Sequence, residues 1–277
     1  MKNLPDKKPK NSIKYGDSFI LGNHRLICGD ARDEQTLKTL IGKDKINALI
    51  TDPPYSVGYV ESKANFKQKL SCDKKIANDQ LMTEEDYAYF TEKWLKPIIP
   101  YFTKKNTVYI FNSDRMIFTI RDVMLKLGYK FSQLLIWVKN NAVVGRLDYQ
   151  PQHELIAYGW YGRHKFKKSK DKSVLVCPRP QKSKLHPTMK PISLMRRLIL
   201  NSTNIGDVIY DPFGGSGSTL IAAEQTKRKC MTMELDPEYC QVIIDRYEKL
   251  SDQKAKKLKS IYGNKNPNTR TNAPGKK

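Results

Sequence analysis

Residues 52–55, with the sequence DPPY, directly follow an apolar run over 46–50 and carry groups that could hold a planar nitrogen base. Each proline fixes its own φ and has no backbone N–H, so the turn is stiff and its carbonyls have few competing donors. Asp52 and the Pro53 carbonyl can accept the two hydrogens of an exocyclic amine, while the Tyr55 ring stacks on the base. Taken alone, the motif is more simply explained as a strand end followed by a proline-rich turn.

A glycine-rich segment at 211–219, with the sequence DPFGGSGST, lies between a strand pattern and a helical pattern. Glycines allow a tight turn and close approach to a ligand, and the following helix offers unpaired N–H groups. Glu234 ends the next predicted strand about 20 residues further on, a spacing suited to carboxylate bonds with ribose hydroxyls. The segment therefore indicates a nucleoside cofactor. It lacks a P-loop lysine and the dinucleotide glycine pattern, which disfavours ATP and NAD.

Together, DPPY, DPFGGSGST, MELDPEYC at 233–240 and HPTMKP at 186–191 resemble the motifs of amino-methyltransferases that act on DNA with S-adenosylmethionine. The catalytic motif precedes the cofactor loop, an order similar to that of the beta class. LICGDA at 26–31 and TVYIFN at 107–112 are further matches, so the resemblance spans residues 15–248. It implies direct methyl transfer to the amine of a base extruded from duplex DNA, without a covalent enzyme intermediate or a metal. Asp52 is also placed to take the amine proton, and the sequence leaves the timing open.

The resemblance also implies a set of site residues. The catalytic residues would be Asp52, Pro53, Pro54 and Tyr55. The cofactor residues would be Asp30, Ala31, Asp52, His186, Thr188, Lys190, Asp211, Phe213, Gly215, Ser216, Gly217, Ser218, Thr219, Glu234 and Leu235. No metal site is expected, because the cysteines and histidines show neither zinc-type spacing nor an HExxH pair.

A formal net charge of +22 implies a polyanionic partner, because Lys and Arg that neutralise phosphates release counterions. Basic residues concentrate over 163–190, and the family's target-recognition region corresponds to residues 140–185. The expected DNA contacts are Lys63, Lys67, Lys139, Arg146, Arg163, His164, Lys165, Lys167, Lys168 and Lys170. A solvated basic loop without a specific role is the alternative, since phosphate contacts read no bases. Residues 56–80 form either a lid over the extruded base or a surface loop.

These motifs need a scaffold, and periodicity supplies one. Strands are predicted near 19–28, 48–51, 107–111, 134–139, 155–158, 208–211 and 230–235. Helices are expected between them, one of them with Thr83 as its N-cap and the others over 191–201, 220–225 and 237–250. This pattern predicts an α/β fold with a doubly wound, mostly parallel seven-stranded sheet. The family resemblance implies that this sheet is of the S-adenosylmethionine-dependent methyltransferase type, with a small target-recognition insertion.

The methyltransferase domain is expected over 15–250, divided into a catalytic half (15–139), the target-recognition region (140–185) and a cofactor half (186–250). Flexible basic termini are expected at 1–14 and 251–277. No apolar stretch is long enough for a membrane span and the N-terminus is too polar for a signal peptide, which predicts a cytoplasmic protein without a membrane partner.

DPPY rather than SPPY favours N6 of adenine over N4 of cytosine within the family. The sequence leaves open N4-cytosine methylation, a catalytically inactive DNA-binding regulator, and a methyltransferase acting on RNA. Double-stranded DNA is the expected partner, with a homodimer and a separately encoded restriction enzyme as further partners suggested by the family. The recognised DNA sequence has no code at this level.

Overall fold

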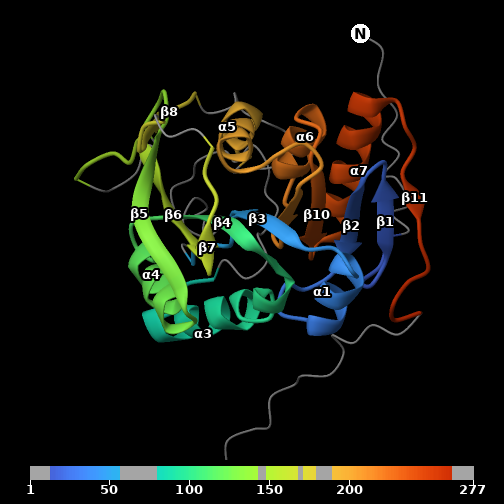
Figure 1. Ribbon diagram of the computed structural model, residues 1–277, viewed down its shortest axis with the longest axis horizontal. Coiled ribbons are helices and arrows are strands. Elements are labelled where there is room, and N and C mark those ends of the chain that lie inside the picture. The colour runs from blue at the N-terminus through green and yellow to red at the C-terminus, as the bar shows by residue number, and fades with distance from the viewer. Residues whose placement is uncertain (1–12, 57–79, 143–147, 168–170, 179–188, 264–277) are drawn as a thin grey trace, which may run out of the picture.

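The computed structural model describes residues 13–56, 80–142, 148–167, 171–178 and 189–263. A mixed β-sheet runs through these residues with helices on both of its faces (Figure 1). From one edge to the other, the strands are β11 (Lys256–Lys257), β1 (Ser18–Leu21), β2 (His24–Cys28), β10 (Lys229–Glu234), β9 (Val208–Asp211), β3 (Ile46–Thr51), β4 (Phe102–Asn112), β6 (His153–Tyr161), β5 (Tyr129–Val138) and β8 (Val174–Val176). The short strand β7 (Arg163–His164) pairs with the start of β4.

The centre of the sheet confirms the predicted fold class. Strands β2, β10, β9, β3 and β4 run parallel, and β6 lies antiparallel between β4 and β5. Strands β1, β11 and β8 widen the sheet beyond the predicted set. The predicted strand over 19–28 is a hairpin instead, because Gly22, with φ of 57°, allows a tight turn between Leu21 and His24.

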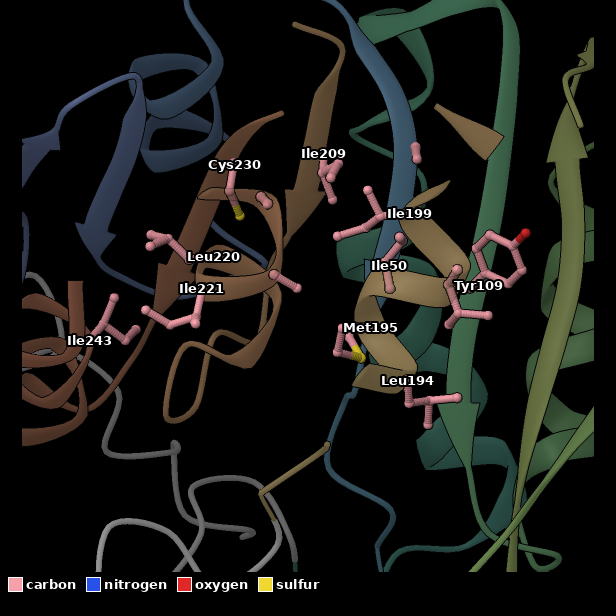
Figure 2. Packing of buried hydrophobic residues seen from close by; sticks show 14 of the residues in the cluster. Ile50, Tyr109, Leu194, Met195, Ile199, Ile209, Leu220, Ile221, Cys230 and Ile243 are labelled. Carbon is pink, nitrogen blue, oxygen red and sulfur yellow. The ribbon is translucent and has the colours of Figure 1, made fainter. Parts of the chain in front are cut away.

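Helices cover the two faces because side chains alternate along the strands. Helices α5 (Ile192–Ser202), α6 (Ser218–Gln225) and α7 (Pro237–Ser251) pack on one face, and α1 (Glu34–Ile41), α3 (Glu84–Leu95) and α4 (Ile117–Lys126) pack on the other. In β4, Tyr109 faces the first layer, whereas Val108 and Ile110 face the second. Figure 2 shows Met195 and Ile199 of α5 packed beside Ile50 and Tyr109.

Side-chain caps fix where several helices begin. Thr83 caps α3 as predicted, since its side chain accepts a hydrogen bond from the Asp86 N–H at 3.1 Å. Asp33 caps α1 in the same way, and Asp236 caps α7. A 3₁₀ turn, η1 (Ile99–Tyr101), leads from α3 into β4.

Residues 251–263 pack on the domain, which differs from the expected flexible tail starting at 251. Strand β11 pairs with β1, and the Lys257 ammonium lies 2.5 Å from the Asp17 carboxylate. The Tyr262 ring stacks on Tyr15 and its hydroxyl donates to Asp33. Residues 1–12 and 264–277 of the expected termini lie outside the described residues. No helix in the described part of the chain is long and apolar enough to cross a membrane.

Candidate active site

The carboxyl ends of the parallel strands meet at one edge of the sheet, called here the carboxyl edge. Asp52 follows β3, Asp211 ends β9 and Glu234 ends β10. Strands β3 and β9 are neighbours, and the chain leaves them in opposite directions across the sheet. They therefore mark the topological switch point, the place where open α/β sheets bind ligands.

The DPPY turn is held from two sides. The Tyr55 hydroxyl donates to Asp52 Oδ1 at 2.6 Å. The Tyr87 hydroxyl donates to the Pro54 carbonyl at 2.8 Å and itself accepts from Asn112 Nδ2 at 2.7 Å. Among the described residues, none of the hydrogen bonds uses the Pro53 carbonyl.

Two carboxylates and two ammonium groups meet beside this turn and form what we call the charge network. Lys190 Nζ lies 2.5 Å from Asp52 Oδ2 and 3.1 Å from Glu154 Oε2. Lys139 Nζ lies 2.8 Å from Glu154 Oε1, and the Tyr55 hydroxyl oxygen lies 2.9 Å from Glu154 Oε2. The side chains of Lys190 and Lys139 are only 5% and 7% exposed, so solvent screens these charges weakly.

The two carboxyl groups of the network differ in acidity. Burial raises the pKa of Asp52 and the Glu154 charge adds to this, although Lys190 opposes it. Burial also acts on Glu154, but Lys190 and Lys139 outweigh it and lower the pKa of Glu154 to about 2. For Lys190, the two carboxylates overcome burial and raise the pKa. Glu154 and Lys190 are therefore charged at neutral pH, and Asp52 is the carboxyl that a proton reaches first.

The charge network changes the expected roles of two residues and adds one that the sequence analysis missed. Lys139, expected at DNA, instead has a buried ammonium that is paired with Glu154. Lys190, expected at the cofactor, reaches Asp52 with its side chain. Glu154 was not predicted at all. A single acid among the apolar residues of a buried strand was the only local signal for it.

On the cofactor side, Glu234 and the glycine turn lie together. Glu234 accepts hydrogen bonds from the backbone N–H groups of Gly215 at 2.7 Å and Asp236 at 2.8 Å. Burial nevertheless raises the pKa of Glu234 to about 7. Gly215 and Gly217 have φ values of 52° and 82°, which L side chains rarely adopt, and Gly217 is the N-cap of α6, which therefore has no side-chain cap.

Asp211 anchors the start of the same turn. It accepts from Thr51 Oγ1 at 2.9 Å and from the Phe213 N–H at 3.2 Å, while burial raises its pKa to about 7 against hydrogen bonds from Thr219 and Thr51. Phe213 lies edge-on to Trp94, with ring centroids 5.3 Å apart.

Two more expected cofactor residues belong to this turn. Ser216 and Ser218 follow Gly215, and the Ser216 carbonyl accepts from Arg246. The Ser218 hydroxyl donates to the Lys190 carbonyl at 2.9 Å. The backbone of Lys190, whose side chain reaches Asp52, is thus tied to α6, the helix that follows the glycine turn.

The loop after β2 completes this part of the site. Cys28 pairs with Glu234 across β2 and β10, so Asp30 and Ala31 start their turn beside it. Asp30 is paired with Arg32 at 2.6 Å, Ala31 is buried, and the Leu235 carbonyl accepts from the Cys28 thiol at 3.7 Å. A carboxylate at a strand end, an uncapped helix N-terminus and glycines without side-chain bulk suit a nucleoside with ribose hydroxyls.

Most of the expected DNA contacts lie away from this edge or outside the described residues. Lys63, Lys67, Arg146, Lys168 and Lys170 lie outside them, as do the expected cofactor residues His186 and Thr188. The others are Arg163, His164, Lys165 and Lys167. Strand β6 runs from Glu154 at the carboxyl edge to Tyr161 at the opposite edge, about 23 Å away at about 3.3 Å per residue.

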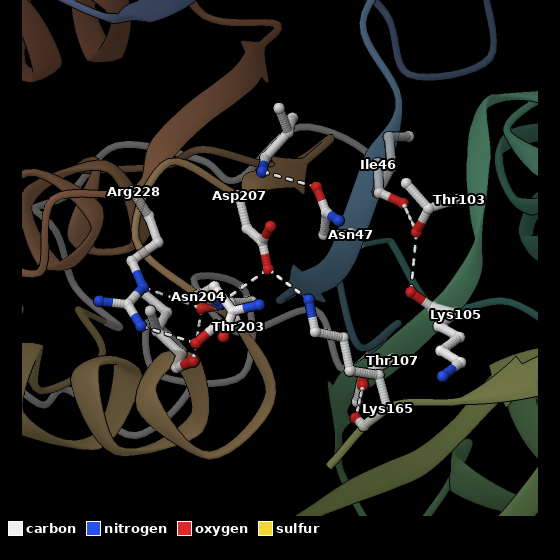
Figure 3. Close-up of polar contacts among 12 residues, drawn as sticks. Ile46, Asn47, Thr103, Lys105, Thr107, Lys165, Thr203, Asn204, Asp207 and Arg228 are labelled. Carbon is white, nitrogen blue, oxygen red and sulfur yellow. Dashed lines mark hydrogen bonds and ion pairs between the residues drawn. The ribbon is translucent and has the colours of Figure 1, made fainter. Parts of the chain in front are cut away.

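At that opposite edge, Arg163 pairs with Lys105 near the start of β4. Figure 3 shows Lys165 directed at Asp207, and the two charged groups lie 2.6 Å apart. The His164 ring accepts or donates a 2.6 Å hydrogen bond with Tyr158. These positions lie at the edge of the sheet opposite Asp52, so any DNA contact made by this basic stretch would fall away from the catalytic turn.

The comparisons with known proteins agree with this fold and site. The N6/N4 DNA methylase family model matches residues 46–245, most of the chain. The chain belongs to this family and is an S-adenosylmethionine-dependent DNA methyltransferase of the N6-adenine/N4-cytosine kind.

Individual relatives support the same assignment. The chain is 26% identical to the type II methyltransferase M.HpaI of Haemophilus parainfluenzae over 82% of its length and 74% of that protein. It is 25% identical to M2.DpnII of Streptococcus pneumoniae over 74% and 83%. The crystal structure of the M1.HpyAVI–SAM complex is 26% identical, with a TM-score of 0.58, and the match covers 80% of this chain and 98% of that one. The cytosine-N4-specific PvuII DNA methyltransferase shares the fold, with a TM-score of 0.64 at 17% identity over 83% and 91%.

Proposed function

We propose that this protein methylates the exocyclic N6 amine of an adenine extruded from duplex DNA. The observation that carries the proposal is the placement of the Asp52 carboxylate and the Pro53 carbonyl at the switch point, beside the glycine turn that follows Asp211. Two acceptors on one stiff turn suit the two hydrogens of an amine. The choice of adenine rests on the resemblance of DPPY to the adenine-specific form of the motif.

The residues of the turn have distinct proposed roles. Extrusion of the base costs roughly a few kcal/mol, and stacking on an aromatic ring returns about 1–3 kcal/mol. Lys190 Nζ lies 5.2 Å from the centroid of the Tyr55 ring, and we assign this ring to stacking on the extruded base. Hydrogen bonds from the amine to Asp52 and the Pro53 carbonyl then turn the nitrogen lone pair away from conjugation with the base.

Bound S-adenosylmethionine would supply an electrophilic sulfonium methyl group, and its sulfur would keep the electron pair of the broken bond to that methyl. The amine nitrogen would become cationic on accepting the methyl group, and Asp52 would receive its proton and pass it to water. We assign Glu234 to the ribose hydroxyls, the turn from Phe213 to Thr219 to the remainder of the cofactor, and Asp30 and Ala31 to its adenine. Because the curated relatives are type II methyltransferases, we also propose that a separate restriction enzyme shares the DNA site.

The test is direct. Purified protein is incubated with unmethylated duplex DNA and S-adenosylmethionine, and the DNA is digested to nucleosides for mass spectrometry, with Asp52→Ala alongside. N6-methyladenine with the unaltered protein alone supports the proposal, provided that Asp52→Ala still binds S-adenosylhomocysteine. N4-methylcytosine would replace adenine by cytosine as the target. The absence of any methylated nucleoside on DNAs of diverse sequence, or normal turnover by Asp52→Ala, would refute it.

A further inference from the structure

Both oxygens of Asp52 already have partners before any substrate binds. Oδ1 accepts from Tyr55 at 2.6 Å and Oδ2 accepts from Lys190 at 2.5 Å. The Tyr55 hydroxyl has a single proton and also lies 2.9 Å from Glu154 Oε2, so it can donate to only one of the two carboxylates at a time. Asp52 and Glu154 therefore share two partners, Tyr55 and Lys190.

Glu154 is held independently of Asp52. Its second oxygen, Oε1, pairs with Lys139 at 2.8 Å, and its position at the start of β6 is fixed by the pairing of Glu154 with Trp137 of β5. Lys190 thus lies between one carboxylate that is anchored, Glu154, and one at the tip of the catalytic turn, Asp52. The charged groups facing Asp52 are Lys190 and Glu154, with Tyr55 on the same turn and Asp211 at the end of the neighbouring strand.

We infer that Glu154 and Lys190 are positioning residues for methyl transfer: anchored through Lys139, they keep the Asp52 carboxylate ionised and oriented for the amine of the target base. The inference rests on the proposed function and adds residues to it. Two buried carboxylates without a cation between them would share a proton, and a protonated Asp52 is a poor acceptor for an amine. Lys190 prevents this. Glu154 in turn shares Lys190 with Asp52. A lysine paired with Asp52 alone would neutralise that carboxylate and compete with the amine for it.

Lys190 and Glu154 carry opposite charges, so removing one or the other should shift the pKa of Asp52 in opposite directions. Lys190→Met removes the cation and raises the pKa of Asp52 by about 1–3. Glu154→Gln removes a repelling anion and lowers it. The double variant Lys190→Met/Glu154→Gln removes one charge of each sign and returns the pKa towards that of the unaltered protein. A side chain that only fills space would not produce this cancellation.

The pKa of Asp52 is read directly by NMR titration of protein labelled at the aspartate side-chain carbon, with Asp52→Asn to assign the signal. This readout needs neither DNA nor turnover, so it separates failure of the inference from failure of the proposed function, which would show as unmethylated DNA with the unaltered protein. In the methylation assay, we expect the acid limb of the pH profile of kcat/KM to shift in each variant in the same direction as the pKa of Asp52 measured by NMR. At neutral pH, turnover by Lys190→Met falls on the order of 100-fold, and the double variant recovers part of that loss.

Controls separate this role from folding and from cofactor binding. Lys126→Met removes an ion pair of 2.6 Å with Glu92 at the end of α4 and should leave the Asp52 titration and turnover unchanged. Lys190→Arg keeps the charge and should keep the acid limb in place. Melting temperature reports on folding, and calorimetry with S-adenosylhomocysteine reports on the cofactor site. An Asp52 pKa that is the same in all folded variants, or a Lys190→Met variant that loses only S-adenosylhomocysteine binding, would overturn the inference.

Discussion

Glu234, which we assign to the cofactor ribose, should make the free protein less stable at neutral and alkaline pH. Its pKa of about 7, against an ordinary 4.5, arises because burial disfavours the charged carboxylate despite two backbone hydrogen bonds. The folded protein therefore holds this proton more tightly than the unfolded chain does. The resulting stabilisation is complete below pH 4.5 and is lost as the pH rises to 7. The difference between the two pKa values corresponds to about 3 kcal/mol.

Glu234→Gln stays uncharged at every pH and keeps an oxygen for the Gly215 N–H. Compared with the unaltered protein, the variant should gain about 3 kcal/mol of relative stability between pH 4.5 and pH 8, or on the order of 6 °C in melting temperature. The assay is thermal unfolding of the free protein at both pH values, with the exposed Glu85→Gln as the control. Calorimetry should show that the same variant binds S-adenosylhomocysteine at least about tenfold more weakly, since a neutral amide is a poorer partner for ribose hydroxyls. A stability difference that is independent of pH would refute the reasoning.

Two other variants test the placement of the DNA surface and of the cofactor turn. Arg163→Ala combined with Lys167→Ala should leave the affinity for duplex DNA and its salt dependence unchanged, because both residues follow β6 at the edge opposite Asp52. Fluorescence anisotropy measured across salt concentrations checks this. A decrease of about 1 or more in the slope of log binding constant against log salt concentration would contradict it. Gly217→Ala should lower the melting temperature by about 2–4 °C, since its φ of 82° costs an L residue about 1–2 kcal/mol and a Cβ would lie 3.0 Å from Ile243. An unchanged melting temperature for a folded Gly217→Ala would show that the turn has another conformation.

The parts of the fold that could be predicted were those encoded locally. Asp52, Asp211 and Glu234 each end or follow an apolar run that forms a parallel strand, and parallel strands bring their carboxyl ends to the same edge. The capping side chain of Thr83 likewise gave the start of α3. The hairpin between β1 and β2 was missed, because Gly22 and Asn23 interrupt the apolar pattern by only two residues.

The positions of Glu154 and of the basic residues after β6 depended on the direction of a single strand. Strand β6 is antiparallel to its neighbours, and its sequence does not reveal which end reaches the carboxyl edge. That direction puts Glu154 beside Asp52 and sends Arg163 and the residues after it to the far edge. The ion pair of Lys139 with Glu154 could not be foreseen for a related reason, since a count of basic residues does not show which ammonium groups are buried against a carboxylate.

The direction of β6 also decides how much net positive charge remains beside the catalytic turn, because it brings Glu154 next to Lys139 and Lys190. At the catalytic turn, Lys139 and Lys190 are offset by Asp52 and Glu154, so the charge network is nearly neutral in the absence of ligands. This balance suits methyl transfer, during which a neutral amine becomes cationic. A lysine paired with Asp52 alone would cancel the negative charge that the amine requires at that moment. Because Lys190 is shared with Glu154, part of the Asp52 charge stays available, and the attraction for DNA phosphates must come from basic residues outside the network.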